Sequence, residues 1–155
     1  MMTSDAFKSR VYWLAYLGLL PLIISTLMLL INVSGQLALS MAHYYGAIVL
    51  TFIGAIHWGR AMQTGNLYSV TLSVLPSLYA FCCLLLPVTT ALLFLIAGFV
   101  VLYFYDAGQY VRYQWFKEIR AQLTGLFCGL LLINWLASSV YAWLPSIPLL
   151  PGRQG

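Results

Sequence analysis

Charged residues are scarce in this chain. Lys and Arg together number 7 and Asp and Glu only 3, so charged side chains make up 6% of the 155 residues. A soluble domain carries roughly 25% charged residues, and so few charges cannot cover the surface of a soluble globule. Hydrophobic residues make up 63% of the chain, which excludes intrinsic disorder, because disordered chains are poor in apolar side chains. The composition therefore indicates a protein that crosses a membrane several times.

Motifs for familiar chemistry are also missing. The cysteines Cys82, Cys83 and Cys128 form no CxxC pair, and no cluster of His and carboxylate residues suggests a metal site. The sequence has neither a glycine-rich nucleotide-binding loop nor a nucleophile motif. It also lacks a basic patch for nucleic acid. We therefore expect no metal, no catalytic residues and no nucleic-acid partner, and we lean against an enzyme.

Long apolar runs are what the sequence has instead. A helix needs about 20 apolar residues to cross a bilayer, and five runs qualify or nearly do. They cover about residues 11–31, 42–62, 70–86, 88–105 and 121–143. Apolar residues follow one another without alternation, which favours helices over a β-barrel. The predicted fold is all-α, a single bundle of five transmembrane helices, with an interfacial loop at 106–120 and a Pro-rich tail at 144–155.

The positions of the basic residues predict the orientation. Six of them fall at one end of a five-span topology: Lys8, Arg10, Arg60, Arg112, Lys117 and Arg120. Only Arg153 falls at the other end. Cytoplasmic loops carry the excess of Lys and Arg, so the N-terminus is expected in the cytoplasm and the C-terminus outside. The segment before the first run is short for an organelle transit peptide, which favours the inner (cytoplasmic) membrane of a bacterium.

Glycines recur at helical spacing in two of the runs. Gly125 and Gly129 are one turn apart in the last run, and the second run holds Gly46, Gly54 and Gly59. Small residues at this spacing let helix backbones approach closely, either within the bundle or between two copies. The first hypothesis is therefore a non-enzymatic accessory or scaffold protein, packing through these faces as a homo-oligomer or within a larger membrane complex.

His57 is the most informative polar residue. It shares a helix face with Gly46 and Gly54, so we expect it to point into the bundle. Ionisable groups within a membrane are costly and often functional. The alternative is a histidine satisfied by one neighbouring carbonyl or hydroxyl group.

A second set of polar residues falls at the same end of the bundle. Arg60 and Asp106 end the second and fourth spans, and an ion pair between them would neutralise both charges. The alternative is a pair that only tethers the helices, or two charges that each reach water separately. The residues that could join His57 in a cytoplasm-facing pocket are Trp58, Arg60, Tyr105, Asp106, Gln109 and Arg112. Basic pockets of this kind bind lipid head groups. Pro21 and Pro76 interrupt the first and third spans, and such kinks can open a cavity.

The alternative hypothesis for the function follows from these residues. It is a binder or carrier of a small apolar ligand such as a quinone, a lipid or a tetrapyrrole. A more specific variant places two haems in a dimer, one near each membrane face, with His43 of both copies ligating one haem and His57 of both copies ligating the other. Because a b-type haem usually takes two axial ligands, this variant requires a symmetric dimer.

The central part of the chain resembles a known family. The resemblance rests on Tyr45-Gly46-Ala47, Phe52-Ile53-Gly54-Ala55-Ile56-His57-Trp58-Gly59, Pro76-Ser77-Leu78, Leu85-Leu86-Pro87, Gly98-Phe99, Asp106, Trp115-Phe116, Arg120 and Leu123-Thr124. These segments are similar to the transmembrane protein 69-like family known as domain of unknown function 3429. Ala55 and Phe116 depart from the expected glycine and tyrosine. The resemblance implies a membrane location, names no reaction, and marks Gly46, Gly54, His57, Trp58, Gly59 and Asp106 for testing.

Overall fold

The chain folds as a bundle of antiparallel helices. The computed structural model describes residues 5–65, 67–109 and 114–143, and these are helical apart from short turns. The helices are α1 (Asp5–Leu17), α2 (Leu20–Leu30), α3 (Gly35–Thr64), α4 (Leu67–Leu84), α5 (Val88–Gln109) and α6 (Gln114–Trp143). Four segments are long and apolar enough to cross a membrane: Asp5–Leu30, Gly35–Gln63, Val88–Gly108 and Trp115–Ser139. With the shorter apolar helix α4, they confirm the predicted all-α membrane bundle.

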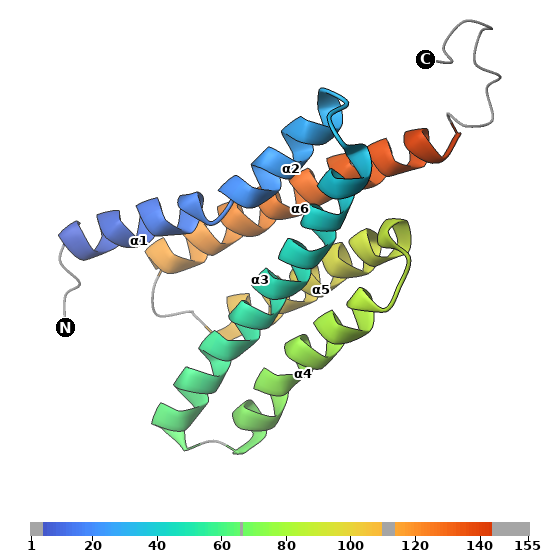
Figure 1. Ribbon diagram of the computed structural model, residues 1–155. Helices are drawn as coiled ribbons and strands as arrows, with labels where there is room; N and C mark the ends of the chain where they lie inside the picture. The colour runs from blue at the N-terminus through green and yellow to red at the C-terminus, as the bar shows by residue number, and fades with distance from the viewer. Residues whose placement is uncertain (1–4, 66, 110–113, 144–155) are drawn as a thin grey trace, which may run out of the picture.

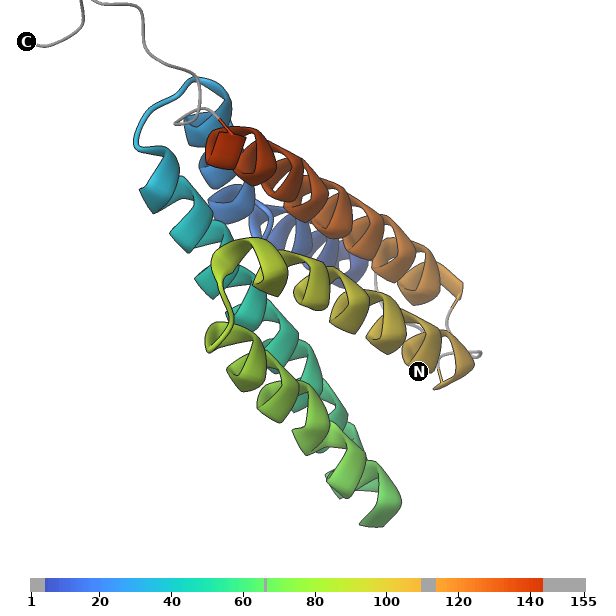
Figure 2. The ribbon, with the colours of Figure 1, turned by 90° about the vertical axis from the view of Figure 1, so that its right-hand side faces the viewer.

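The central helix is α3, which packs against α2, α4, α5 and α6. The start of α1, the end of α3 and the start of α6 lie toward the same side of the bundle (Figure 1). Helices α5 and α6 run side by side, and α3 pairs with α4 as a hairpin. The hairpin diverges from the α5–α6 pair toward the end where α3 finishes (Figure 2). This divergence positions the site described below.

The first span differs from the single helix expected at 11–31. It begins earlier, at Asp5, and is broken between α1 and α2 at Gly18 and Leu19. Pro21 lies in the first turn of α2. Because proline lacks an N–H group and its ring clashes with the carbonyl four residues back, α1 ends at Leu17 and a new helix starts at Leu20.

The other boundaries also shift. Helix α3 begins at Gly35 rather than at residue 42, and α4 ends at Leu84, before Pro87. The expected loop at 106–120 is largely helical, because α5 continues to Gln109 and α6 begins at Gln114. The end of this segment is amphipathic, because the apolar residues Trp115, Phe116 and Ile119 alternate with charged ones. Ile119 is buried, so this amphipathic segment joins the last span as one helix. The predicted tail at 144–155 lies outside the described residues.

Three glycines mark where helices touch most closely. A Cβ atom on Gly46 would lie 2.9 Å from Leu95 of α5, and one on Gly98 would lie 2.8 Å from Tyr79 of α4. A Cβ on Gly54 would lie 3.0 Å from both the Ser73 carbonyl oxygen and the ring of Pro76. Real Cβ contacts are essentially never shorter than 3.0 Å and are seldom as short as 3.0 Å, so these positions use the small size of glycine to join α3, α4 and α5.

The remaining predicted packing glycines have open surroundings. A Cβ on Gly59, Gly125 or Gly129 would meet no atom of the described chain within 4 Å. Among the described residues, these three glycines therefore make no close helix contact.

Candidate functional site: an apolar cavity with a buried His–Asp–Arg cluster

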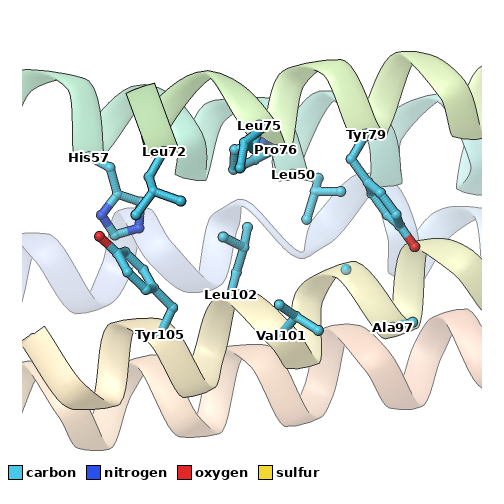
Figure 3. A pocket seen from close by; sticks show the side chains of 11 residues that line it. Leu50, His57, Leu72, Leu75, Pro76, Tyr79, Ala97, Val101, Leu102 and Tyr105 are labelled. Atoms are coloured by element: carbon cyan, nitrogen blue, oxygen red, sulfur yellow. The ribbon is translucent and has the colours of Figure 1, made fainter. Parts of the chain in front are cut away.

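A cavity of about 270 Å³ lies between α3, α4 and α5. Its walls are formed by Leu50, His57, Leu72, Leu75, Pro76, Tyr79, Ala97, Gly98, Val101, Leu102 and Tyr105 (Figure 3). Eight of these eleven residues carry no polar side-chain atom, and the exceptions are the histidine and the two tyrosines. The cavity is therefore an apolar space with a few polar groups in its wall.

The close helix contacts explain why the cavity forms here. Pro76 presses against Gly54 and holds α4 to α3, while Tyr79 packs on Gly98 and reaches α5. The Tyr79 hydroxyl donates a hydrogen bond of 2.7 Å to the Phe94 carbonyl. Beyond these contacts α4 leaves α5, and the space between them is the cavity.

The opposite end of the cavity is polar. His57 lies there, with its Nε2 atom 2.7 Å from Oδ1 of Asp106. The other carboxylate oxygen of Asp106, Oδ2, accepts a hydrogen bond from the guanidinium group of Arg120. Asp106 on α5 thus links α3 to α6. Its side chain is only 3% exposed, and that of Arg120 is 15% exposed.

The contact between His57 and Asp106 is close but not well aligned. The distance is that of a hydrogen bond, yet the contact lacks the geometry of an aligned hydrogen bond. Neither Nε2 nor Oδ1 has a hydrogen-bond partner among the described residues, and both atoms are buried. Among the described residues each of these two buried atoms has the other, at 2.7 Å, as its close polar partner.

Tyr105 completes this end of the cavity. Its ring meets the His57 ring edge-on, with centroids 5.3 Å apart and an interplanar angle of 72°. The two side chains lie together at one end of the cavity, and Tyr79 lies at the other (Figure 3). The imidazole is therefore held by a carboxylate on one side and an aromatic ring on another.

The structure brings some of the predicted site residues together. His57 and Asp106 are in contact, and Tyr105 lies beside them. Trp58 is 46% exposed and does not line the cavity. The side chain of Arg60 and the whole of Arg112 lie outside the described residues, as does the side chain of Gln109.

Arg120 is the residue that sequence reasoning missed. The sequence pattern places it in a loop, because the last span is expected to begin at residue 121. The structure starts α6 at Gln114, which places Arg120 on a helix beside Asp106. The available signal was the amphipathic pattern around Ile119, which already had helical spacing.

The second histidine has a different environment. His43 is buried, and its Nε2 lies 3.0 Å from the carbonyl oxygen of Cys83. Pro87 cannot donate to this carbonyl as a helical residue at its position would, and the carbonyl accepts instead from the Leu86 backbone N–H, at 3.2 Å, and from the imidazole N–H. Haem ligation through Nε2 of either histidine would displace the contact described for that atom.

A second polar cluster joins α2, α3 and α6. The Asn134 amide donates to the Thr26 hydroxyl at 2.7 Å and to the Leu130 carbonyl at 2.9 Å. The Ser25 hydroxyl lies 2.8 Å from the Ala38 carbonyl and 3.3 Å from the Asn134 side-chain oxygen. These groups satisfy one another, so the cluster is a structural link between helices.

Comparison with known proteins identifies the family. A family described as "Protein of unknown function (DUF3429)" matches residues 7–136. A curated relative, "Transmembrane protein 69" of Xenopus tropicalis, is 33% identical over 150 residues, which is 89% of this chain and 58% of that protein. The chain thus spans little more than half the length of this relative, and no solved structure matches. The chain belongs to the DUF3429 family of membrane proteins, as the sequence resemblance predicted.

Proposed function

We propose that the protein binds a small, largely apolar ligand from the bilayer in the cavity between α3, α4 and α5. The observation that carries this proposal is a buried histidine, held by a carboxylate, at the end of an otherwise apolar cavity. Small-molecule sites are typically apolar spaces of roughly 300–1,000 Å³ with a few convergent polar groups. A cavity of about 270 Å³ lies just below that range, which suits a single ring system or a short lipid segment.

The free-energy cost of burying charged groups supports a role for them beyond stability. Replacing a buried ion pair by packed apolar residues is often neutral or stabilising. Ionisable residues inside membrane proteins commonly mark ligand or ion sites for this reason. Apolar side chains could tie the three helices together at least as well as Asp106, Arg120 and His57 do, whereas only polar partners can orient an imidazole at a binding site.

The route into the cavity also supports an apolar ligand. Leu75 of α4 and Val101 of α5 both line the cavity, and they are 51% and 66% exposed. On a membrane-embedded helix this exposed surface faces lipid. A ligand dissolved in the bilayer can therefore enter sideways between α4 and α5 without crossing water.

Native mass spectrometry of the protein extracted in mild detergent tests the proposal. The wild type should retain an adduct of defined mass, which the cavity-filling variant Ala97→Phe should lose. Ala55→Phe is the matched control, because Ala55 is also exposed on a membrane helix but does not line the cavity. Adducts of the same mass and occupancy in all three proteins would overturn the proposal.

A second candidate function is the scaffold role through glycine-rich faces. One observation favours it: Gly125 and Gly129 lie one turn apart on α6 with no described atom within 4 Å of a Cβ, which leaves room for another helix. Crosslinking in native membranes should then give an oligomer that Gly125→Leu and Gly129→Leu abolish. A strictly monomeric wild type would remove this candidate.

For location we propose the cytoplasmic membrane of a bacterium, with the N-terminus inside. The charge distribution supports this orientation, since Lys8, Lys117 and Arg120 lie on helix segments at the same end of the bundle (Figure 1). The curated relative is eukaryotic, so fractionation of the source cells decides which membrane. Reporter fusions at the two termini test the orientation, and an external N-terminus would contradict it.

A further inference from the structure

We infer that the ligand is a neutral apolar alcohol or phenol, whose hydroxyl group donates a hydrogen bond to Nδ1 of His57. This inference rests on the proposed binding function and narrows its ligand class. It follows from the charge of Asp106, the charge of the imidazole and the nitrogen that carries the imidazole proton.

The first step concerns Asp106. It lies between a guanidinium group that is always charged and the His57 ring, so it is a carboxylate. A carboxylate accepts hydrogen bonds and cannot donate them. Nε2 of His57, 2.7 Å from Oδ1, must therefore carry the proton.

The second step concerns the charge of the imidazole. Arg120 already balances the charge of Asp106. A second proton on His57 would place a positive charge without a partner beside an apolar cavity, and a buried charge without a partner is costly. The imidazole is therefore neutral, and the partner on Nε2 fixes the tautomer, as hydrogen bonding to one ring nitrogen generally does.

The third step follows from this tautomer. With the proton on Nε2, Nδ1 has a lone pair and is an acceptor. Among the described residues no hydrogen bond to Nδ1 is found, and the His57 side chain lines the cavity. A ligand that satisfies this atom must bring a donor. A quinone carbonyl or an ester has no donor, whereas a quinol, a sterol or another apolar alcohol has one.

A carboxylic acid is a poorer match than a hydroxyl group. It would pass its proton to His57 and leave a carboxylate in the cavity, whose described wall offers no lysine or arginine. The Tyr79 hydroxyl already donates to Phe94, so Tyr105, beside the imidazole (Figure 3), carries the only further hydroxyl among the described lining residues. The Tyr105 hydroxyl can donate a hydrogen bond to the oxygen of a bound alcohol. It is neutral and cannot balance the negative charge of a bound carboxylate.

Ring-nitrogen NMR on protein with isotope-labelled histidine tests the inference. The chain has 2 histidines, and His43 is an internal reference because it lies outside the cavity. Three probes share one skeleton: para-hexylphenol, para-hexylanisole and para-hexylbenzoic acid. We expect the phenol to bind about tenfold more tightly than the anisole and to shift only the Nδ1 signal of His57. In His57→Phe, which keeps a flat ring but has no acceptor, this preference should disappear while the anisole still binds.

The other outcomes contradict the inference, and they show whether the proposed binding function fails with it. If phenol and anisole bind equally and Nδ1 does not shift, the hydroxyl inference is wrong and the proposed cavity function stands. If the benzoic acid binds best and both His57 nitrogens become protonated, the inference is also wrong. If no probe binds and no signal moves, both the inference and the proposed function fail. Should His57→Phe not fold, the wild-type spectra still decide among these results.

Discussion

Replacing Arg120 with leucine should strongly destabilise the bundle. The substitution leaves the carboxylate of Asp106, which is 3% exposed, with His57 as its only partner among the described residues. Breaking a buried ion pair by removing one partner typically costs about 3–5 kcal/mol. Because His57 remains in contact and Arg120 is itself 15% exposed, we expect the lower end, about 3 kcal/mol. This corresponds to a loss of about 100-fold in the ratio of folded to unfolded protein.

Reversible unfolding in mixed micelles of mild detergent and SDS measures this cost. The double variant Asp106→Asn, Arg120→Leu should recover part of the loss, because the amide oxygen still accepts from His57 and no charge is left unbalanced. Coupled neighbours show interaction energies of about 0.5–3 kcal/mol, and recovery of at least about 1 kcal/mol is expected here.

The control is the exposed pair Lys8–Asp5, whose charged atoms are 3.6 Å apart. Lys8→Leu removes a cation from the same end of the bundle and should leave the unfolding midpoint unchanged, because exposed ion pairs contribute little. If Arg120→Leu is no more destabilising than Lys8→Leu, or if the double variant is less stable than Arg120→Leu alone, the buried-pair reasoning is refuted.

The helix contacts make further predictions for the same unfolding assay. Gly54→Ala should lower the midpoint, because its Cβ would lie 3.0 Å from the backbone oxygen of Ser73, whereas Gly125→Ala meets no described atom within 4 Å and should not. A lower midpoint for Gly125→Ala than for Gly54→Ala would contradict this reading of the glycines. Asn134→Leu removes hydrogen bonds to α2 and should cost about 1 kcal/mol, in the range measured for interhelical hydrogen bonds in membranes. An unchanged midpoint would show that this cluster contributes nothing to stability.

The fold could be predicted from the sequence because the bilayer imposes strong rules. Every backbone group in lipid must be satisfied within its own helix or barrel, so apolar runs of sufficient length become helices. The boundaries were less predictable. Pro21 shows that a proline in an apolar run predicts an interruption of the helix. The proline does not show whether the result is one kinked helix or two separate helices. The early start of α6 shows that an amphipathic segment beside a span can belong to it.

The site was predictable in part. The helix face containing Gly54 placed His57 inside the bundle, and the order of the spans placed Asp106 at the same end. Neither observation pointed to Arg120, because the pairing depends on how α5 and α6 align over their length. The cavity could not be predicted at all. It exists because Gly54 and Gly98 let α4 touch α3 and α5 at particular points and diverge elsewhere, and such contacts between distant segments leave no local signature.

Photolabelling with a small apolar diazirine, followed by mass spectrometry of the labelled peptides, tests the central claim most directly. If the cavity binds apolar molecules from the bilayer, labels should concentrate on the α4 and α5 residues that line it, between 72 and 79 and between 97 and 105. The label should be competed by unlabelled para-hexylphenol and lost in Ala97→Phe. Labelling spread evenly over the lipid-facing surfaces of all the helices, without competition, would contradict the claim that this cavity is a binding site.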